Sequence, residues 1–334
     1  MTAPAAKPVH TTCPYCGVGC GVVAHPDDTI KADTAHPSNR GRLCSKGAAL
    51  AATLDDSTRL TAPMVDGRAE SWERAIQVVA DRFRDTIAQH GPDSVAFYVS
   101  GQCLTEDYYV ANKLMKGFIG SANIDTNSRL CMASSVAGHV RAFGEDVVPG
   151  VYEDWEEADL VVLVGSNAAW CHPVLHQRLL AARAERGTKI VVIDPRRTAT
   201  AEAADLHLPL AAGADVALFN GLLAYLGRNR YVDGIWVSSH TNGFAEAMAA
   251  AERDTGDVEA VADLCGIDPE LVETFYDLFE QTERVVTVYS QGVNQSETAT
   301  DAIGAILNLH LATGRIGRPG AGPFSLTGQP NAMG

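Results

Sequence analysis

Basic charge, long apolar runs and a secretion signal are all scarce or missing in this sequence. Lysine and arginine number 26 against 41 acidic residues, and the resulting formal charge of −15 argues against nucleic-acid binding, which draws its affinity from excess positive charge. No run approaches the roughly 20 apolar residues of a membrane span, and the first residues carry neither an apolar signal core nor a twin-arginine pair. The sequence therefore predicts a cytoplasmic globular protein with no nucleic-acid partner and no membrane.

The eight cysteines need an explanation other than disulfides, because cytoplasmic thiols are kept reduced. Cys13, Cys16, Cys20 and Cys44 are spaced C-x2-C-x3-C-x23-C, in a segment rich in glycine and proline. Three thiolates from one tight loop and a fourth from a distant segment are typical of a [4Fe–4S] cluster. Structural zinc is the alternative, although zinc sites more often use two separate C-x2-C pairs. We predict a small, loop-dominated cluster module over residues 1–60.

Beyond residue 60 the pattern changes to alternating helices and strands. The periodicity predicts helices at 71–90, 105–117, 173–186, 214–227, 268–282 and 298–313, and strands at 95–99, 159–165, 189–194 and 284–290. In the first of these helices, one face is apolar and consists of Trp72, Ala75, Ile76, Val79, Phe83 and Ile87. Strands separated by crossover helices indicate an α/β fold with a doubly wound, mostly parallel sheet. We place it within residues 61–334, with a dinucleotide-binding-like subdomain at about 155–285.

Single residues in these two regions give weaker signals. Lys46 follows the fourth cysteine closely enough to influence a cluster, although an isolated lysine is usually a solvated charge. Gly165-Ser166-Asn167 follows a buried strand, where a glycine turn and a helix start can bind a phosphate. Asp194 ends the next strand, where such folds place an acid on a ribose hydroxyl, or it is an ordinary turn residue before proline. Without its neighbouring motif, Cys131 would be predicted to be a small, buried hydrophobic residue.

Six segments taken together resemble a known family. They are the cluster motif ending in CSKG, TNSRLCMASSV around Cys131, VLVGSNAAWCHPV, VVIDPRRTATA, GVNQSETATD and the final GRIGRPGAGPFSLTGQPNAMG. In this order they resemble the molybdopterin oxidoreductases of the dimethyl-sulfoxide-reductase superfamily, and most closely the catalytic subunits of bacterial assimilatory nitrate reductases. The resemblance extends from Thr11 to Gly334 and implies that the chain is the N-terminal portion of a longer polypeptide.

The resemblance implies a ligand set for two cofactors, one [4Fe–4S] cluster and a molybdenum bis-molybdopterin guanine dinucleotide. Cys131 would be the thiolate ligand of molybdenum, which suits a metal already held by sulfur. Lys46 would lie between cluster and pterin as part of the catalytic machinery. The remaining positions implied to bind the pterin cofactor are Gln102, Asn127, Gly165, Ser166, Asn167, Asp194, Arg196, Gly213, Asp215, Gln291 and Gln295. Gln291 departs from the methionine expected in related nitrate reductases.

The activity implied is the reduction of nitrate to nitrite in nitrate assimilation, with electrons entering through the cluster. Ferredoxin, flavodoxin or an NADH-linked flavoprotein would be the electron donor. A formate dehydrogenase of the same superfamily is one alternative, but those enzymes typically have histidine after the metal-ligating residue, where this chain has Met132. A non-catalytic iron–sulfur electron-transfer subunit is the other. Cys103, Cys171 and Cys265 have no motif role and are predicted to be core thiols.

Overall fold

The computed structural model describes residues 7–332, apart from the side chain of residue 254, and the chain divides into two compact units. Unit 1 contains the residues up to Leu130 together with the short segment from Gln329, and unit 2 is Cys131–Gly328. Among the described residues, no helix is both long and apolar enough to cross a membrane. The module boundary predicted at residue 60 lies inside unit 1 and stays a prediction.

Unit 1 begins with a three-stranded antiparallel sheet in the segment predicted to consist mainly of loops. Its strands are β1 (Val9–Thr12), β2 (Gly21–Ala24) and β3 (Ile30–Ala32), in that order. All four residues of β1 are exposed, so the strand has no alternation of apolar and polar residues that a sequence pattern could reveal. The short helical turns α1 (Ser45–Ala48) and η1 (Leu50–Leu54) follow the fourth cysteine.

The rest of unit 1 contains the long helix α2 (Trp72–His90), which confirms the helix predicted at 71–90. Its ends are locally encoded: the Ser71 hydroxyl accepts a hydrogen bond from the Arg74 amide, and Gly91 ends the helix with φ +81°. The apolar face is present but only partly covered, with Trp72 65% and Ile76 62% accessible. The other elements are β4 (Met64–Val65), β5 (Arg68–Ala69), η2 (Pro92–Ser94), β6 (Phe97–Val99), α3 (Thr105–Asn112), η3 (Lys113–Ile119), β7 (Ile124–Thr126) and α4 (Ser128–Cys131), which ends at the boundary of unit 2.

Unit 2 is built on a five-stranded parallel sheet, as predicted. The strand order is β10-β9-β8-β11-β12, with bounds Leu206–Leu208, Lys189–Ile193, Leu160–Val164, Val285–Tyr289 and Gly322–Ser325. The chain moves outward from β8 in one direction through β9 and β10, and in the other through β11 and β12. The sheet is therefore doubly wound, and its direction reverses between β8 and β11. Ligands bind such sheets at this switch point, beyond the carboxyl ends of the strands.

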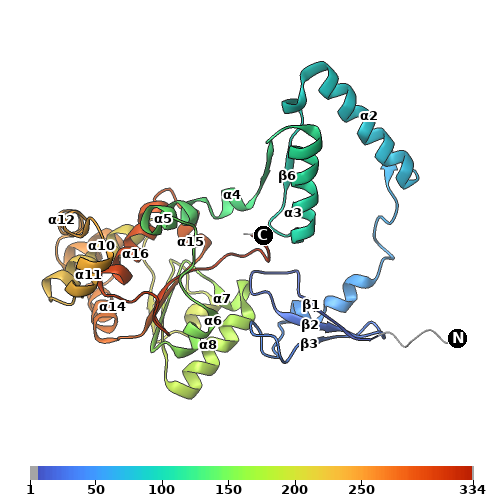
Figure 1. Cartoon of the computed structure of the whole chain (residues 1–334). Coiled ribbons are helices and arrows are strands. Elements are labelled where there is room, and N and C mark those ends of the chain that lie inside the picture. The colour runs from blue at the N-terminus through green and yellow to red at the C-terminus, as the bar shows by residue number, and fades with distance from the viewer. Residues whose placement is uncertain (1–6, 333–334) are drawn as a thin grey trace. The chain divides into compact units, whose positions relative to one another are not determined.

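Helices cover both faces of this sheet (Figure 1). On one face, Leu160, Val162 and Val164 pack into a continuous core with apolar side chains of α10, α13, α14 and α16. Val161 and Leu163 point to the opposite face, where α6 and α8 lie. Burying each such side chain contributes about 1.5–3 kcal/mol, so both faces stabilise the strands.

The helices of unit 2 largely match the predicted ranges. α8 (Pro173–Arg186) begins with proline at its first position and ends before Gly187, which has φ +78°. α10 (Asp215–Arg228), α14 (Pro269–Gln281) and α16 (Ala299–Ala312) also confirm predictions. The sequence pattern does not predict the strands β10 and β12 or the helices α11 (Gly234–His240), α12 (Phe244–Thr255) and α13 (Val258–Cys265). The remaining helices are α5 (Ala133–Phe143), α6 (Tyr152–Glu157), α7 (Ala168–Cys171), α9 (Ala199–Glu202) and α15 (Gln291–Asn294).

Candidate functional site

The four N-terminal cysteines share one neighbourhood within unit 1. The loop that carries the first three closes on itself, because the Cys13 amide donates to the Cys20 carbonyl at 2.8 Å and Gly19 adopts φ +64°. Burial raises the pKa of Cys13 and Cys16, and raises that of Cys20 to about 12. The negative charges of neighbouring thiolates, Cys44 among them, raise all three further. Thiols that destabilise one another's charge in this way are suited to a shared cationic centre.

Two residues that the sequence analysis missed hold the Cys44 segment against this loop. The Asn39 side chain is fully buried; its oxygen accepts from the Gly21 amide at 2.8 Å, and its nitrogen donates to the carbonyls of Gly21 at 3.0 Å and Arg42 at 2.8 Å. The Ser38 hydroxyl donates to the Gly19 carbonyl at 2.7 Å. No sequence pattern marks the contacts with Gly21 and Gly19, since they join residues 18 and 19 positions apart.

Lys46 lies on α1, next to the cysteines. Its positive charge lowers the pKa of Cys13 and Cys16, against the larger effect of burial. The side chain is exposed.

Within residues 7–332, no three His, Cys, Asp or Glu side chains are grouped tightly enough to hold a single metal ion.

Gln102 and Asn127 lie at the ends of the parallel strand pair β6 and β7 in unit 1. The Asn127 side-chain oxygen accepts from the Gly101 amide at 2.9 Å, so it fixes the loop that carries the exposed Gln102. The segment from Gln329 lies on the same loop: the Asn331 amide donates to the Gly101 carbonyl at 3.0 Å. The strand pair thus brings together Gln102 and Asn127, two of the residues predicted to bind the pterin cofactor.

Unit 2 has a cavity of about 430 Å³ at the switch point of its sheet. Its walls come from the turns that follow β8, β9 and β11 and from the turn before α10. Eight residues predicted to bind the pterin cofactor line it together: Gly165, Asn167, Asp194, Arg196, Gly213, Asp215, Gln291 and Gln295. Ser166 is buried, and its hydroxyl has no hydrogen-bond partner among the described residues.

The cavity wall depends on two glycines in direct contact. Gly165 has φ +53°, and a Cβ on it would lie 2.7 Å from the Gly292 Cα atom. A Cβ on Gly292 would in turn lie 2.5 Å from the Gly165 Cα atom. Any side chain at either position would push apart the two turns at the switch point, where a ligand phosphate needs close backbone approach.

Carboxylates and one guanidinium give the cavity its polar character. Asp194 is nearly buried, and it accepts a hydrogen bond at 2.9 Å from the amide of Arg196, whose guanidinium lies exposed 4.0 Å from the carboxylate. Burial raises the pKa of Asp215, and the charge of Asp194 raises it further. Asn167 accepts at 2.8 Å from the Thr200 hydroxyl, a partner that the sequence analysis missed. Carboxylates accept hydrogen bonds from ribose hydroxyls or base amino groups, and the guanidinium suits a phosphate.

Cys131 lies half-buried at the end of α4. Two side-chain amides approach its sulfur: Gln291 Nε2 is 3.8 Å from Cys131 Sγ, and Gln295 Nε2 is 3.6 Å from it. Both glutamines also line the switch-point cavity. A cysteine sulfur faced by two amide donors beside a cavity of this size fits the metal-ligand role that the resemblance implies.

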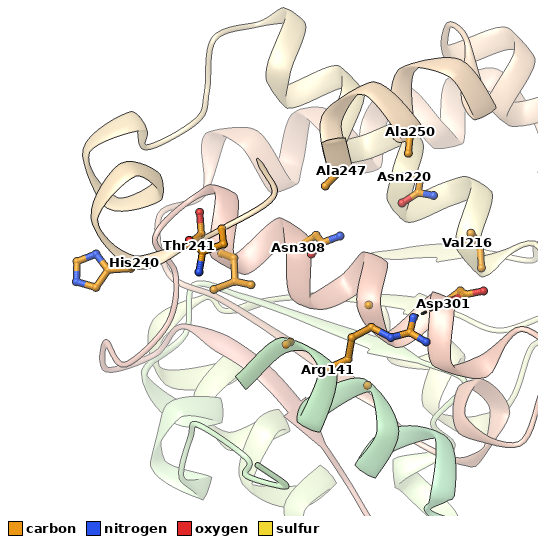
Figure 2. Close-up of a pocket in the computed structure, with 14 residues that line it drawn as sticks. Arg141, Val216, Asn220, His240, Thr241, Ala247, Ala250, Asp301 and Asn308 are labelled. Atoms are coloured by element: carbon orange, nitrogen blue, oxygen red, sulfur yellow. Dashed lines mark hydrogen bonds and ion pairs between the residues drawn. The ribbon is translucent and has the colours of Figure 1, made fainter. Parts of the chain in front are cut away.

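A second cavity in unit 2, of about 590 Å³, contains none of the predicted residues (Figure 2). It is lined mainly by α5, α10, α12 and α16, and an exposed ion pair joins Arg141 to Asp301 at 3.1 Å. Asn220 and Asn308 also line this cavity.

Of the three thiols predicted to be in the core, Cys265 is buried and Cys103 is half-buried. The prediction is wrong for Cys171, which is exposed and lines the switch-point cavity because it ends the short helix α7 beside that cavity.

A doubly wound sheet with a polar cavity at its switch point, in one chain with a four-cysteine module, is typical of a protein that binds a cofactor and a cysteine-ligated metal centre. Comparison with known families matches residues 59–333 to molybdopterin oxidoreductase and residues 6–56 to the molybdopterin oxidoreductase Fe4S4 domain. The chain belongs to the molybdopterin oxidoreductase family. The family match to the Fe4S4 domain favours the cluster over structural zinc.

Individual relatives agree with this family. A nitrate reductase of Klebsiella oxytoca is 54% identical over 329 residues, which cover 97% of this chain and 37% of that protein. A formate dehydrogenase subunit alpha of Methanocaldococcus jannaschii is 34% identical, covering 98% of this chain and 49% of that protein. The structure of acetylene hydratase from Pelobacter acetylenicus has the same fold, with a TM-score of 0.78 at 23% identity over 93% of this chain and 44% of that chain. The chain spans less than half the length of these relatives.

Proposed function

We propose that this chain is part of a molybdenum-dependent nitrate reductase that acts in nitrate assimilation. Nitrate would accept two electrons and two protons, giving nitrite and water. The observation that carries the proposal is the placement of Cys131 Sγ against Gln291 and Gln295, at the edge of a cavity lined by eight residues expected to bind the cofactor. Nitrate as the substrate is supported by the 54% identical nitrate reductase. The cytoplasmic location remains a prediction from the sequence.

The switch-point cavity would hold one guanine dinucleotide of a bis-molybdopterin guanine dinucleotide. Asp194 and Asp215 would accept hydrogen bonds from the ribose or the guanine base, and Arg196 would pair with a phosphate. The contact between Gly165 and Gly292 would let a phosphate approach the backbone. When bound, the molybdenum cofactor supplies two-electron transfer and oxygen-atom exchange, chemistry that no side chain offers.

Cys13, Cys16, Cys20 and Cys44 would hold the [4Fe–4S] cluster, through which electrons enter one at a time. Asn39 and Ser38 would keep the fourth ligand in reach of the first three. Lys46 would place a positive charge beside the cluster, where it stabilises the reduced, more negative state. Ferredoxin, flavodoxin or an NADH-linked flavoprotein would deliver the electrons.

Formate dehydrogenase is the competing function, supported by the relative at 34% identity. Position 132 is methionine, whereas a formate dehydrogenase is expected to have histidine there, and this difference favours nitrate as the substrate. Assays of the purified holoenzyme with reduced methyl viologen and nitrate, and with formate and oxidised viologen, decide between the two. Formate oxidation without nitrate reduction would reject nitrate as the substrate.

Replacing Cys131 tests the metal-ligand role directly. Cys131→Ala should abolish nitrate reduction, because it removes the sulfur that faces both Gln291 and Gln295. The EPR signal of the reduced cluster should persist. Metal analysis of the parent protein should give about four iron atoms and one molybdenum per chain. Iron without molybdenum would instead identify an electron-transfer subunit, and nitrate turnover by Cys131→Ala would refute the ligand assignment.

A further inference from the structure

The turn that follows β11 has a fixed place on the sheet of unit 2. The Gly292 amide donates to the Gly165 carbonyl at 3.0 Å, and the Ser290 amide donates to the Val164 carbonyl at 3.3 Å. The Ser290 hydroxyl donates to the Leu326 carbonyl at 3.0 Å. With the two glycines in van der Waals contact, α15 is tied to the strands on both sides of β11.

Asn294 is the last residue of α15, and its side chain binds the Cys131 backbone from this fixed segment. Its side chain is 3% exposed, and its Nδ2 atom donates to the Cys131 carbonyl at 2.6 Å. The same nitrogen lies 3.8 Å from the Met132 sulfur. The Oδ1 atom is buried and accepts no hydrogen bond from the described residues. The amide of Asn294 is therefore directed entirely at the Cys131 segment.

The Cys131 segment needs such a contact because the helix is interrupted there. α4 ends at Cys131 and α5 begins at Ala133; Met132 between them has ψ 7°, outside the helical range. A carbonyl at a helix end lacks its usual partner in the next turn. Fixing the Cys131 carbonyl also fixes the Cα–Cβ direction, which leaves Sγ only the rotation about one bond.

We propose that Asn294 is a positioning residue for the Cys131 thiolate. Its amide holds the Cys131 carbonyl on α15, and the two glutamines of the same turn then face the sulfur, Gln291 at 3.8 Å and Gln295 at 3.6 Å. The carbonyl anchor and the two sulfur contacts all come from five consecutive residues, so one rigid segment sets the direction of the thiolate. This proposal rests on the proposed role of Cys131 as the molybdenum ligand.

Asn294→Leu tests the proposal, because leucine is similar in volume and donates no hydrogen bond. In the metal-loaded enzyme we expect kcat to fall about 10- to 100-fold, as for other residues that orient metal ligands, with little change in KM for nitrate. The Mo(V) EPR signal should shift or broaden at unchanged metal content. In the metal-free protein, amide exchange of the peptide around Cys131–Val136 should rise about fivefold, as expected for the loss of one hydrogen bond.

Asn308→Leu is the matched control. Asn308 is a half-buried asparagine of unit 2 that lines the second cavity, between α5, α10, α12 and α16 (Figure 2). Its side chain has no hydrogen-bond partner among the described residues. This variant should leave the EPR signal, kcat and local exchange unchanged. Asn294→Ser, which shortens the donor out of reach, is measured alongside and should behave as Asn294→Leu does.

The proposal is overturned if Asn294→Leu and Asn294→Ser keep the parent EPR signal and the parent exchange rate around Cys131. It is also overturned if Asn308→Leu produces the same changes, because the effect would then be one of general packing. A parent protein that binds no molybdenum would refute the proposed function. The exchange measurement on the metal-free protein would still decide whether Asn294 anchors Cys131.

Discussion

Replacing Asn39 with alanine should weaken cluster binding without touching a cysteine. The substitution removes the three side-chain hydrogen bonds of Asn39: two to Gly21 in the cysteine loop, and one to Arg42 just before Cys44. The Gly21 amide then loses its buried acceptor, which costs about 1–3 kcal/mol. The other two bonds add about 0.5–1.5 kcal/mol each.

For the hydrogen bonds to the two carbonyls, the loss in stability is near the lower end, about 0.5 kcal/mol each. The Gly21 carbonyl keeps a second donor, the Asp33 amide at 3.0 Å, and the half-buried Arg42 carbonyl can reach water. The total is then about 2–4 kcal/mol. Since each 1.4 kcal/mol is a factor of ten in affinity, Asn39→Ala should weaken cluster retention about 30- to 700-fold.

Chelator competition on the purified protein measures this loss, followed by iron content and the EPR signal of the reduced cluster. Asn229→Ala is the control, because Asn229 is exposed, belongs to unit 2 and donates a hydrogen bond to Glu280 at 2.9 Å, away from the cysteine loop. Iron retention equal to the parent in Asn39→Ala would show that the three hydrogen bonds do not hold the fourth ligand in place.

Two further predictions concern unit 2. Burial, together with the nearby charge of Arg315, lowers the pKa of His310 from 6.5 to about 3. The unfolded chain therefore binds the extra proton first, so the stability from neutral His310 is complete above about pH 6.5 and falls by up to about 1.4 kcal/mol per unit below it. His310→Gln should flatten urea-unfolding stability between pH 7 and 5, and an unchanged slope would contradict this. Gly165→Ala should lower cofactor content because its Cβ would lie 2.7 Å from Gly292, whereas Gly304→Ala, with no atom within 4 Å of its Cβ, should not; equal cofactor content in both variants would disprove the close-contact argument.

The sequence predicts those parts of the fold that carry local signals. α8 was placed at its observed bounds because proline marks its first position and a left-handed glycine follows its last. β12 (Gly322–Ser325) was missed because it contains glycine and proline, and it is a strand only through its parallel pairing with β11. α2 shows the reverse case: its apolar face was predicted correctly, yet Trp72, Ile76 and Val79 on that face are exposed.

Some residues of the candidate site can likewise be predicted from local sequence signals, and others cannot. Gly165, Asp194 and Gln291 follow buried strands, so a doubly wound sheet brings them to one edge whatever the rest of the chain does. Asn39 and Asn294 could not be found this way. Asn39 bonds to Gly21 and Asn294 to Cys131, both well separated along the chain, and a buried asparagine has no periodicity to reveal it.

These two asparagines also share a physical task, each within its own unit. A metal-binding thiol offers little for packing to hold, since its sulfur must stay free for the metal and its side chain has one rotatable bond. The backbone beside the cysteine is what the protein can fix: Asn294 binds the carbonyl of Cys131 itself, and Asn39 binds that of Arg42, two residues before Cys44. An amide carries no charge that would compete with the thiolate or the metal, as a lysine or aspartate would. A ligand held in this way before the metal arrives loses less conformational entropy on binding, so the anchor raises affinity without contacting the metal.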